Sequence, residues 1–412
     1  MHPRPRQAWP AAVVAGAVTA LGLTGCAATP DPDTVTVLNS ATDTAEHAAN
    51  QKYFDRCAKP LGLRVQQLSV PADQVVSKAL RMASSHSLTD ILELDGSELP
   101  QFAETDGLLP LKDVGVHTGG FSRSATSLGT YQGTQYGIAR SANSLALFYN
   151  TDLLRKAGVK PPRTWDELRS VSRKLTSGPV HGMAFSASPN ADGVYQFLPF
   201  FWSAGGDEAH LDHGSGGADA LNLWKELVAD GSASRSVVSW NQQDVNDQFI
   251  AGRTAMMING PWQVPVLNAQ KKVHWAVASL PVPHAGGDAV APIGGTVMTV
   301  PKNDADEDGS RVRHAARILD CLNSESNQLQ WGDSVNNVPT RTDAARAYAQ
   351  RNPQLAPFTG LVATARSRTA EVGTRWPVVS DALAGAFQAV LTGRSDAPAA
   401  LRRAQQQATA GE

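Results

Sequence analysis

Strand-like and helix-like patterns alternate along most of the chain. Runs of β-branched and aliphatic residues between polar residues predict short strands, at 34–38, 64–70, 90–94, 145–149, 254–258, 275–280 and 295–300. Apolar residues three and four apart predict helices, at 51–58, 72–84, 99–104, 152–157, 165–175, 193–204 and 376–391, with another ending at Gly231. Strands that alternate with helices indicate βαβ units and a mostly parallel sheet, hence an α/β fold.

The local signals at helix ends support some of these elements. Thr164–Glu167 matches a capping box, with Thr at the cap and Glu three residues later. From Arg311 onward the pattern predicts almost continuous helix, interrupted near the prolines at 339, 353 and 357. The tail after Arg403 is predicted to be frayed.

The first 25 residues have a pattern of their own. Arg4 and Arg6 precede an uncharged apolar run over 11–23, and so short a run is typical of a secretory signal and not of a membrane span. Leu23–Cys26 resembles the lipobox of bacterial lipoproteins, which implies cleavage before Cys26 and acylation of its thiol. The weaker alternative is an ordinary signal before a structural cysteine. The absence of an Arg-Arg pair favours the general secretion route.

The composition then limits the class of protein. The prolines and acids of residues 26–33 cannot pack, so we expect a tether to the membrane surface. The rest of the chain is too long for one ordinary hydrophobic core and suits two lobes. A formal net charge of −2, from 36 basic and 38 acidic residues without a basic cluster, argues against a nucleic-acid partner.

Two cysteines remain if Cys26 carries lipid. Cys57 and Cys321 permit a single pairing, and an exported chain can keep a disulfide. Two separately buried free thiols are an equally good interpretation of the residues alone.

Three stretches, taken together and in order, resemble the sugar-binding branch of the extracellular solute-binding proteins of ABC transporters. The first is Tyr136–Leu154, which continues through Gly158 into Pro161–Leu168; the second is Phe249–Trp262; the third is Pro292–Gly295 leading into Val297–Pro301. The resemblance covers essentially the whole mature chain. It implies a two-lobed, maltose-binding-protein-like fold of the periplasmic-binding type, with hinge crossovers and a ligand cleft between the lobes.

The resemblance also implies an organisation. Lobe 1 would comprise 34–139 and 292–338, and lobe 2 would comprise 140–291 and 339–412. Strand ends and helix N-termini facing the crevice would hold a polar ligand, and closure would bury a ligand that neither lobe could desolvate alone. Because the family fold puts the parent helices of Cys57 and Cys321 in the first lobe, the resemblance further implies a bridge between them.

A sugar cleft should combine aromatic rings with hydrogen-bonding groups, because sugars have apolar C–H faces and many hydroxyls. The chain has 9 Trp and 6 Tyr. Trp262 follows an Asn-Gly-Pro turn where the family has a stacking aromatic; a core Trp is the alternative. Trp376 opens a late helix where the family has an aromatic facing the cleft, with packing an even alternative. Tyr195 and Trp202 lie in an aromatic segment that forms the wall of the second lobe in the family; most of these rings must be core, and Tyr195 is the better candidate.

Polar candidates come from the same resemblance. Asp95 follows a predicted strand where the family commonly has a sugar-binding acid, and a solvated loop acid is the alternative. Asn39 and Asp43 match a contact region of the family, although Asp43 could simply cap the next helix.

The crossover segments supply the remaining candidates. Arg140 and Asn143 lie at the first crossover, where the family often has contact side chains. Gly294 and Gly295 would let backbone amides approach the ligand closely, or form a tight hinge turn, or both.

Other residues are assigned to packing or to the surface. Trp165, Trp224 and Trp331 lie in helices with apolar periodicity and are predicted to pack. His210 and His213 lie in a Gly-rich loop that is typical of a surface excursion and not of a metal site.

Enzyme motifs are absent from the sequence. It has no Gly-x-Ser-x-Gly, His-Glu-x-x-His, Gly-x-x-x-x-Gly-Lys or Gly-x-Gly-x-x-Gly, and too few cysteines for a Cys-rich metal cluster. We therefore expect no catalytic residue, metal or cofactor. A secreted lipoprotein glycoside hydrolase is the alternative, because paired carboxylates leave no fixed motif. A solute-binding protein for a polyamine, peptide or metal chelate is another.

The expected function follows from these inferences. The chain would be the lipid-anchored, monomeric substrate-binding component of an ABC importer on the outer face of the cytoplasmic membrane. It would bind a mono- or oligosaccharide by hinge closure and pass it to a membrane permease without a chemical step.

Overall fold

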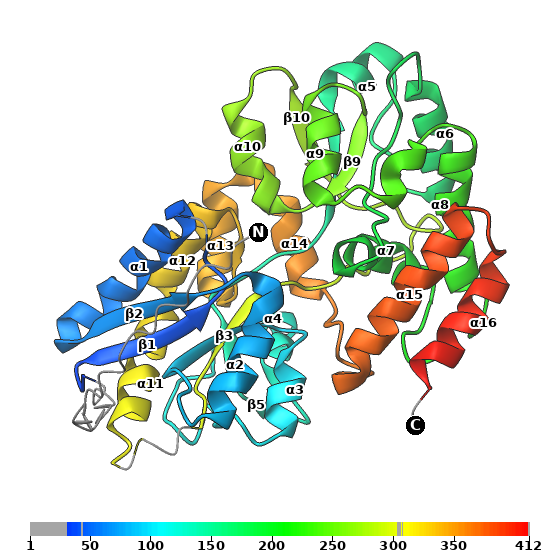
Figure 1. Ribbon diagram of the computed structural model, residues 1–412. Helices are drawn as coiled ribbons and strands as arrows, with labels where there is room; N and C mark the ends of the chain where they lie inside the picture. Colours follow the sequence, from blue (N-terminus) through cyan, green and yellow to red (C-terminus); the bar gives the residue numbers. More distant parts are fainter. Residues whose placement is uncertain (1–30, 43, 303–305, 307, 411–412) are drawn as a thin grey trace, which may run out of the picture. The chain divides into compact units, whose positions relative to one another are not determined.

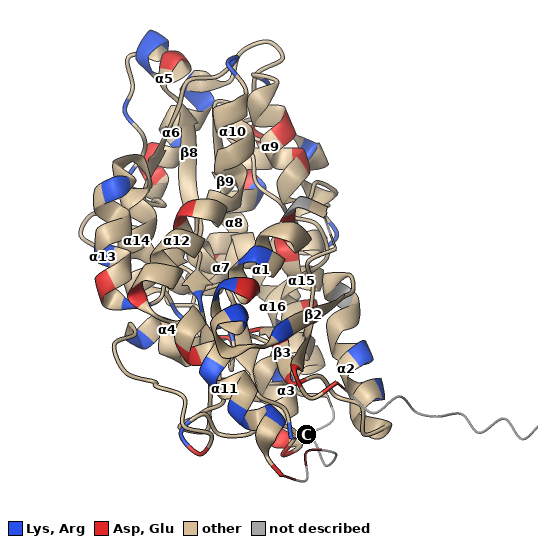
Figure 2. Cartoon of the chain, turned by 90° about the vertical axis from the view of Figure 1, so that its left-hand side faces the viewer, with Lys and Arg blue, Asp and Glu red and all other residues tan. Residues whose placement is uncertain are grey.

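The computed structural model describes residues 31–42, 44–302, 306 and 308–410 (Figure 1). The predicted signal segment, the lipidation candidate Cys26 and the site candidate Asp43 lie outside the described residues. None of the helices in these ranges has both the length and the hydropathy that a membrane span requires. Basic and acidic residues are interspersed on the elements drawn in Figure 2, in keeping with the near-neutral net charge.

The larger of two main sheets has five strands in the order β2-β1-β3-β11-β6. Their bounds are β1 Thr34–Asn39, β2 Arg64–Ser69, β3 Ile91–Asp95, β6 Gly137–Ala139 and β11 Thr296–Thr299. β1 pairs in parallel with β2 and β3, whereas β11 runs antiparallel to β3 and β6. The helices α1 (Thr44–Ala58), α2 (Val75–Ser84) and α11 (Ser310–Leu322) contact its strands (Figure 1).

The second main sheet has three strands in the order β10-β8-β9. β8 (Ala146–Asn150) lies between β9 (Met256–Asn259) and β10 (Trp275–Ala278) and is antiparallel to both. The prediction of a mostly parallel sheet is therefore wrong for this part of the chain. A run of apolar residues indicates that a strand is buried. The run does not indicate whether the strand is parallel or antiparallel to its neighbour, because that depends on where the chain re-enters the sheet.

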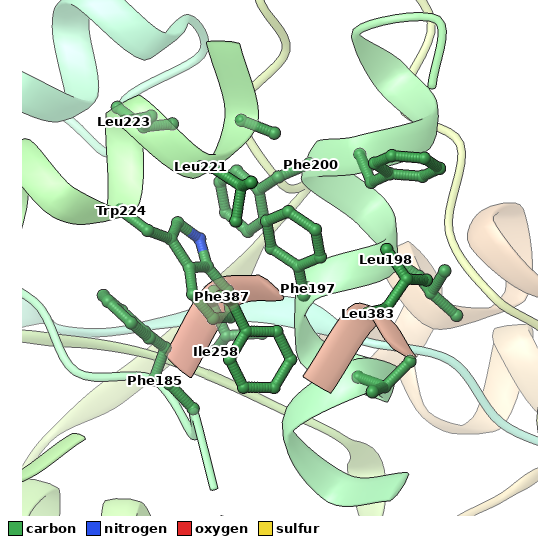
Figure 3. Packing of buried hydrophobic residues seen from close by; sticks show 14 of the residues in the cluster. Phe185, Phe197, Leu198, Phe200, Leu221, Leu223, Trp224, Ile258, Leu383 and Phe387 are labelled. Atoms are coloured by element: carbon green, nitrogen blue, oxygen red, sulfur yellow. The ribbon is translucent and has the colours of Figure 1, made fainter. Parts of the chain in front are cut away.

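An aromatic core lies beside this second sheet (Figure 3). It joins α7 (Ala191–Ser203), α8 (Gly216–Ala229) and α15 (Trp376–Leu391). The rings of Phe197 and Trp224 meet edge to face with centroids 5.1 Å apart, and Phe185 and Phe387 complete the contacts. Trp224 is fully buried, so the prediction that it packs is confirmed.

The remaining elements connect and cover these layers. The helices are α3 Leu99–Glu104, α4 Arg123–Leu128, α5 Thr151–Ala157, α6 Trp165–Leu175, α9 Gln242–Ile250, α10 Val264–Ala269, α12 Glu325–Val335, α13 Thr342–Arg351, α14 Ala356–Thr364 and α16 Ala397–Ala408. Short strands pair β4 (Thr130–Tyr131) with β5 (Thr134–Gln135) and β7 (Ser141–Ala142) with β12 (Val338–Pro339).

Most predicted elements are present, with instructive differences at their ends. At α6 the Thr164 hydroxyl accepts a hydrogen bond from the Glu167 amide, but Glu167 accepts from the Arg163 amide instead of completing the box. The predicted fraying after Arg403 is wrong. Asp396 caps α16, and the small apolar face of that helix, which includes Ala404 and Ala408, is buried.

A disulfide joins the first long helix to a late one. Cys57 of α1 and Cys321 of α11 are bonded, with their Cα atoms 5.7 Å apart. The Asn327 amide donates to the Cys321 carbonyl at 2.7 Å and lies 3.5 Å from both sulfur atoms. The bridge closes a segment of 264 residues and therefore restricts the unfolded chain strongly.

Replacing both cysteines, Cys57→Ser with Cys321→Ser, should lower the free energy of unfolding by about 2–5 kcal/mol, because the unfolded chain regains its freedom. Urea unfolding followed by tryptophan fluorescence measures the change. Wild-type protein reduced with dithiothreitol should unfold at the midpoint of the double variant. Equal midpoints for the oxidised wild type and the variant would contradict the stabilising role.

Candidate ligand-binding site

Three segments far apart in the sequence run side by side near the middle of the fold. Asn143 and Gly294 exchange two backbone hydrogen bonds of 2.9 Å. The Ile293 amide donates to the Arg366 carbonyl at 2.8 Å, and the Arg366 amide donates to Ala291 at 2.9 Å. Residues 141–144, 291–295 and 365–368 thus form one hydrogen-bonded ribbon, which we call the crossover ribbon.

A cleft of about 700 Å³ lies against the crossover ribbon. This volume is ordinary for a small-molecule site. Its lining combines acids, guanidinium groups and aromatic rings, among them Glu46, Asp95, Glu98, Asp192, Arg140, Arg368, Tyr195, Trp262 and Trp331.

The aromatic side of the cleft is built on a short turn and a helix start. Trp262 follows Pro261 in a single turn of 3-10 helix, and its ring lies 6.5 Å from the ring of Tyr195, tilted by 50°. A Cβ atom on Gly260 would come within 1.9 Å of the Trp262 ring. The glycine of the Asn-Gly-Pro-Trp sequence therefore leaves room for the Trp262 ring to pack against the backbone at Gly260. Trp262 remains partly exposed.

Tyr195 is positioned by the N-terminal turn of α7. The Asn190 side chain caps this helix by accepting from the Asp192 and Gly193 amides. The Tyr195 hydroxyl lies 3.2 Å from Asn143 Oδ1 and 3.3 Å from the Pro292 carbonyl, either of which can accept its proton. Burial raises the pKa of Tyr195, so the hydroxyl stays protonated.

The need for glycine at 294 comes from these neighbours. A Cβ atom there would lie 2.4 Å from Asn143 Oδ1 and 2.5 Å from the Tyr195 hydroxyl. Gly294 thus allows two polar side chains to converge on the crossover ribbon.

The acidic side of the cleft begins where β3 ends. Asp95 Oδ1 accepts from the Ser97 amide at 2.9 Å and from Arg368 Nη2 at 2.6 Å. Glu98 Oε2 accepts from the Asp95 amide at 3.2 Å. Burial, and then the negative charge of Asp95, raise the pKa of Glu98 to about 7, while Arg368 acts in the opposite direction.

Arg140 is positioned by two residues outside the cleft lining, Asn50 and Glu93. Its Nη2 donates to Asn50 Oδ1 at 2.8 Å, and its Nη1 lies 3.3 Å from Glu93 Oε1. The guanidinium lies over the Trp331 ring at 3.9 Å from the centroid, a favourable cation–π geometry. The side chain of Arg140 is only 8% exposed, so it presents little more than an edge to the cleft.

The structure brings most of the predicted site residues together. The cleft lining includes Asp95, Arg140, Asn143, Tyr195, Trp262, Gly294 and Gly295. Trp331, predicted to pack, is buried and also lines the cleft.

Three candidates lie in the core and outside the cleft lining. The Asn39 side chain is fully buried and bonds to Gln67 and Ser69 of the neighbouring strand. Trp202 donates to Glu208 at 2.8 Å and is buried. Trp376 is buried and belongs to the core cluster that α7, α8 and α15 share. Their roles in ligand binding have no support from this arrangement.

Sequence reasoning missed several residues of the cleft. Asp192 and Gln242 each follow an asparagine that caps a helix, Asn190 and Asn241, and that signal could have placed them at helix starts. Arg368 lies outside any helix or strand, and no local pattern marks it.

The raised pKa of Glu98 predicts a pH-dependent stability. The pKa of Glu98 is about 7 in the folded chain, above the ordinary value of 4.5. Between these two pH values the folded chain therefore binds more protons than the unfolded chain. As pH rises through this window, the Glu98 carboxyl lowers the free energy of unfolding. Glu98→Gln keeps an oxygen acceptor without the charge. Its Tm should exceed that of the wild type above pH 7, with the difference shrinking toward pH 4.5, by differential scanning fluorimetry.

Asp381→Asn on the exposed side of α15 is a matched loss of one charge and should show no such trend. If the difference in Tm between Glu98→Gln and the wild type does not change with pH, the raised pKa of Glu98 is contradicted.

The fold and the cleft define a class of protein. Two separate sheets, a ribbon of crossing segments and a polar, aromatic-lined cleft against it are the parts of a two-domain binding protein that holds a ligand at the junction. Among the described residues, no group of three His, Cys, Asp or Glu side chains is placed to hold a metal ion.

The chain belongs to the family of bacterial extracellular solute-binding proteins, whose profile matches residues 52–357. A binding protein of Brucella abortus is 26% identical over 384 residues, which are 89% of this chain and 91% of that protein. A maltooligosaccharide ABC transporter solute-binding lipoprotein of Streptococcus pneumoniae is 26% identical over 242 residues, or 54% of this chain and 53% of that protein.

A solved structure agrees over nearly the full length. The crystal structure of a cyclic α-maltosyl-1,6-maltose binding protein from Arthrobacter globiformis matches with a TM-score of 0.79 and 25% identity, covering 92% of this chain and 99% of that one. The predicted two-lobed α/β fold of periplasmic binding proteins is thereby confirmed.

Proposed function

We propose that this chain is the extracellular substrate-binding component of an ABC importer and that it binds a mono- or oligosaccharide in the cleft. The observation that carries the proposal is the cleft itself, which sets the Tyr195 and Trp262 rings beside carboxylate, amide and guanidinium groups. Flat rings pack on the apolar faces of a sugar, and the polar groups bond its hydroxyls.

The relatives support the choice of ligand. One is named for maltooligosaccharide and one for a cyclic maltosyl-maltose, and both are named as binding proteins. By contrast, neither name points to the glycoside hydrolase, polyamine or peptide alternatives.

We place the lobes at 34–139 with 292–338 and at 140–291 with 339–412. Asn143 pairs with Gly294 and Ala142 pairs with Val338, so the segments at the three proposed bounds lie side by side, which supports crossovers between lobes there. Closure about this ribbon would bury the sugar between the lobes and give the permease a closed form to recognise. The protein would act as a monomer, with no chemical step.

The test of the function is a carbohydrate panel read by thermal shift, followed by product analysis. A bound sugar should raise Tm, since a ligand at one hundred times its Kd adds about 2.7 kcal/mol of stability. The sugar should be recovered unchanged after long incubation. Hydrolysis of an oligosaccharide would favour the glycoside hydrolase, and stabilisation by polyamines or peptides but not by sugars would favour those ligands.

Trp262→Ala should weaken sugar binding by about 2 kcal/mol, the loss typical of a buried aromatic anchor. Isothermal titration calorimetry with the best ligand of the panel measures this. Trp275→Ala removes a half-buried indole from β10, outside the cleft lining, and should leave the affinity unchanged. Unchanged affinity in Trp262→Ala would remove this ring from the site.

We propose that Cys26 carries the lipid that anchors the protein to the outer face of the cytoplasmic membrane. The lipobox-like Leu23–Cys26 sequence supports this anchor, as does a relative named as a lipoprotein. In a bacterial host, Cys26→Ser should release the protein from the membrane fraction and abolish labelling by radioactive palmitate. Membrane retention and labelling of the variant would overturn the anchor.

A further inference from the structure

Residues 367–369 have the cleft on one side and a second hollow on the other. This hollow is a groove of about 870 Å³, which we call the second groove, and it shares no lining residue with the cleft. Arg368 lines the cleft, whereas its neighbours Ser367 and Thr369 line the second groove. At the start of α3, Glu98 lines the cleft and Pro100 lines the second groove. The end of the crossover ribbon and the start of α3 therefore separate the two hollows.

The walls of the second groove come from distant parts of the chain. One wall consists of α4 and the β4–β5 turn, which includes Tyr131. The other is drawn from residues 367–375, which lead from α14 to α15 (Figure 1) and end in a 3-10 turn, Gly373–Arg375, that contacts α3. A Cβ atom on Gly373 would lie 3.9 Å from the Tyr131 ring, so the walls meet there. With the lobes placed as proposed above, the first wall belongs to lobe 1 and the second to lobe 2.

The second wall holds a nearly buried pair of hydroxyls. Ser367 is 5% exposed and Thr369 is 8% exposed. Their Oγ atoms lie 3.1 Å apart, and the Thr369 amide donates to Ser367 Oγ at 3.4 Å. Two hydroxyl protons thus share one hydrogen bond, and whichever hydroxyl donates, the other proton has no acceptor among the described residues. A donor this deeply buried needs an acceptor from outside the chain.

The first wall carries hydroxyls whose protons are already used. The Thr126 hydroxyl donates to the Ser122 carbonyl at 3.0 Å, and the Ser127 hydroxyl donates to the Ser124 carbonyl at 2.6 Å. Thr130 Oγ1 donates to the Thr126 carbonyl at 2.8 Å. Each of these oxygens keeps lone pairs, so this wall offers acceptors and needs donors from its occupant.

Two larger side chains complete the lining of the first wall. Arg123 is exposed there, and its guanidinium adds N–H donors. Tyr131 is partly buried, and its ring adds a flat apolar face. The second groove therefore combines donors, acceptors and an aromatic ring.

These groups define the chemical class of an occupant. An oxyanion is the competing class, because Arg123 and Arg375 line the groove against one acid, Glu371. An oxyanion only accepts hydrogen bonds, however, and it would meet the oxygen acceptors of the first wall. A ligand hydroxyl accepts and donates, so it satisfies both walls at once.

We propose that the second groove is a binding site for a neutral polyhydroxylated solute, a free sugar or a polyol, separate from the cleft. The site itself does not depend on the proposed function of the cleft. Its coupling to the cleft does. Closure about the crossover ribbon would draw the two walls of the second groove apart, and a solute held by both walls opposes that movement. Occupants of the two sites therefore weaken each other's binding, because linkage is reciprocal.

The experiment first weakens the cleft and then titrates the second groove. Glucose, sorbitol and inorganic phosphate are titrated by calorimetry into a chain that carries Asp95→Ala and Trp262→Ala. Calorimetry is chosen because osmolytes raise protein stability without binding. Glucose or sorbitol should bind saturably and phosphate should not. The absence of saturable polyol binding, or binding of phosphate alone, would overturn the proposal.

Further variants in the same chain locate the binding. Ser367→Ala with Thr369→Val removes the hydroxyl pair and should weaken polyol binding at least about fivefold. Ala370→Trp places an indole in the second groove and should abolish binding, whereas Ala363→Trp on the exposed side of α14 should preserve it. Circular dichroism and Tm establish that each variant is folded. Polyol binding that survives Ala370→Trp would place the solute elsewhere and overturn the site.

The coupling is measured in the chain with an intact cleft. Saturating sorbitol should weaken binding of the best panel sugar by about fivefold or more. The Ser367→Ala, Thr369→Val variant should lose this effect. An unchanged affinity in the wild type would refute the coupling, and so would an effect that persists in the variant, since sorbitol would then compete in the cleft.

The outcomes separate this inference from the proposed function. If a panel sugar binds the wild type but the cleft-weakened chain binds no polyol, the second groove fails as a site while the proposed function stands. If polyol binding depends on the second groove and no sugar binds the cleft, the proposed function fails while the site stands.

Discussion

The hydrogen-bonded crossover ribbon is the constraint on which the cleft depends. Asn143 and Gly294 pair through their backbones, and the Ile293 amide donates to the Arg366 carbonyl. Because backbone bonds fix these segments against one another, the side chains that leave them have defined directions. Arg366 bonds Glu208 and Arg368 bonds Asp95, two residues apart on one segment. The absence of a side chain at Gly294 lets the Tyr195 hydroxyl reach the same ribbon.

The polar wall behind the cleft depends on buried contacts of α1. Asn50 of this helix holds Arg140, and the ring of Tyr53 lies 4.9 Å from that of Trp331, on which Arg140 stacks. The Cys57–Cys321 disulfide ties the same helix to α11. A buried ion pair such as Arg140–Glu93 is weak evidence for stability, since desolvation offsets much of the attraction. Its clearer consequence is geometric, because it fixes a cation at the edge of the site.

A site residue could be predicted where its surroundings are set by neighbours in the sequence, and not where they are set by distant segments of the chain. Trp262 lies in a Gly-Pro turn and Asp95 is the last residue of β3, so short patterns place both at the ends of elements, the family resemblance assigns both to the site, and both line the cleft. Asn39 has an equally suggestive place at the end of β1. Its amide is nevertheless consumed by Gln67 and Ser69, which only the pairing of β1 with β2 brings near. Trp202, by contrast, donates to a residue close by in the chain, since Glu208 lies six positions later.

The sequence alone determined the positions of most helices and strands, because period, caps and turn residues act over a few neighbours. It also carried the ordered stretches that indicate the family. The tertiary structure decided the antiparallel second sheet, the burial of the C-terminal helix and the composition of the cleft. Arg368 meets Asp95 across 273 positions of the chain. Contacts of that range depend on how whole layers pack, and no local pattern of residues encodes them.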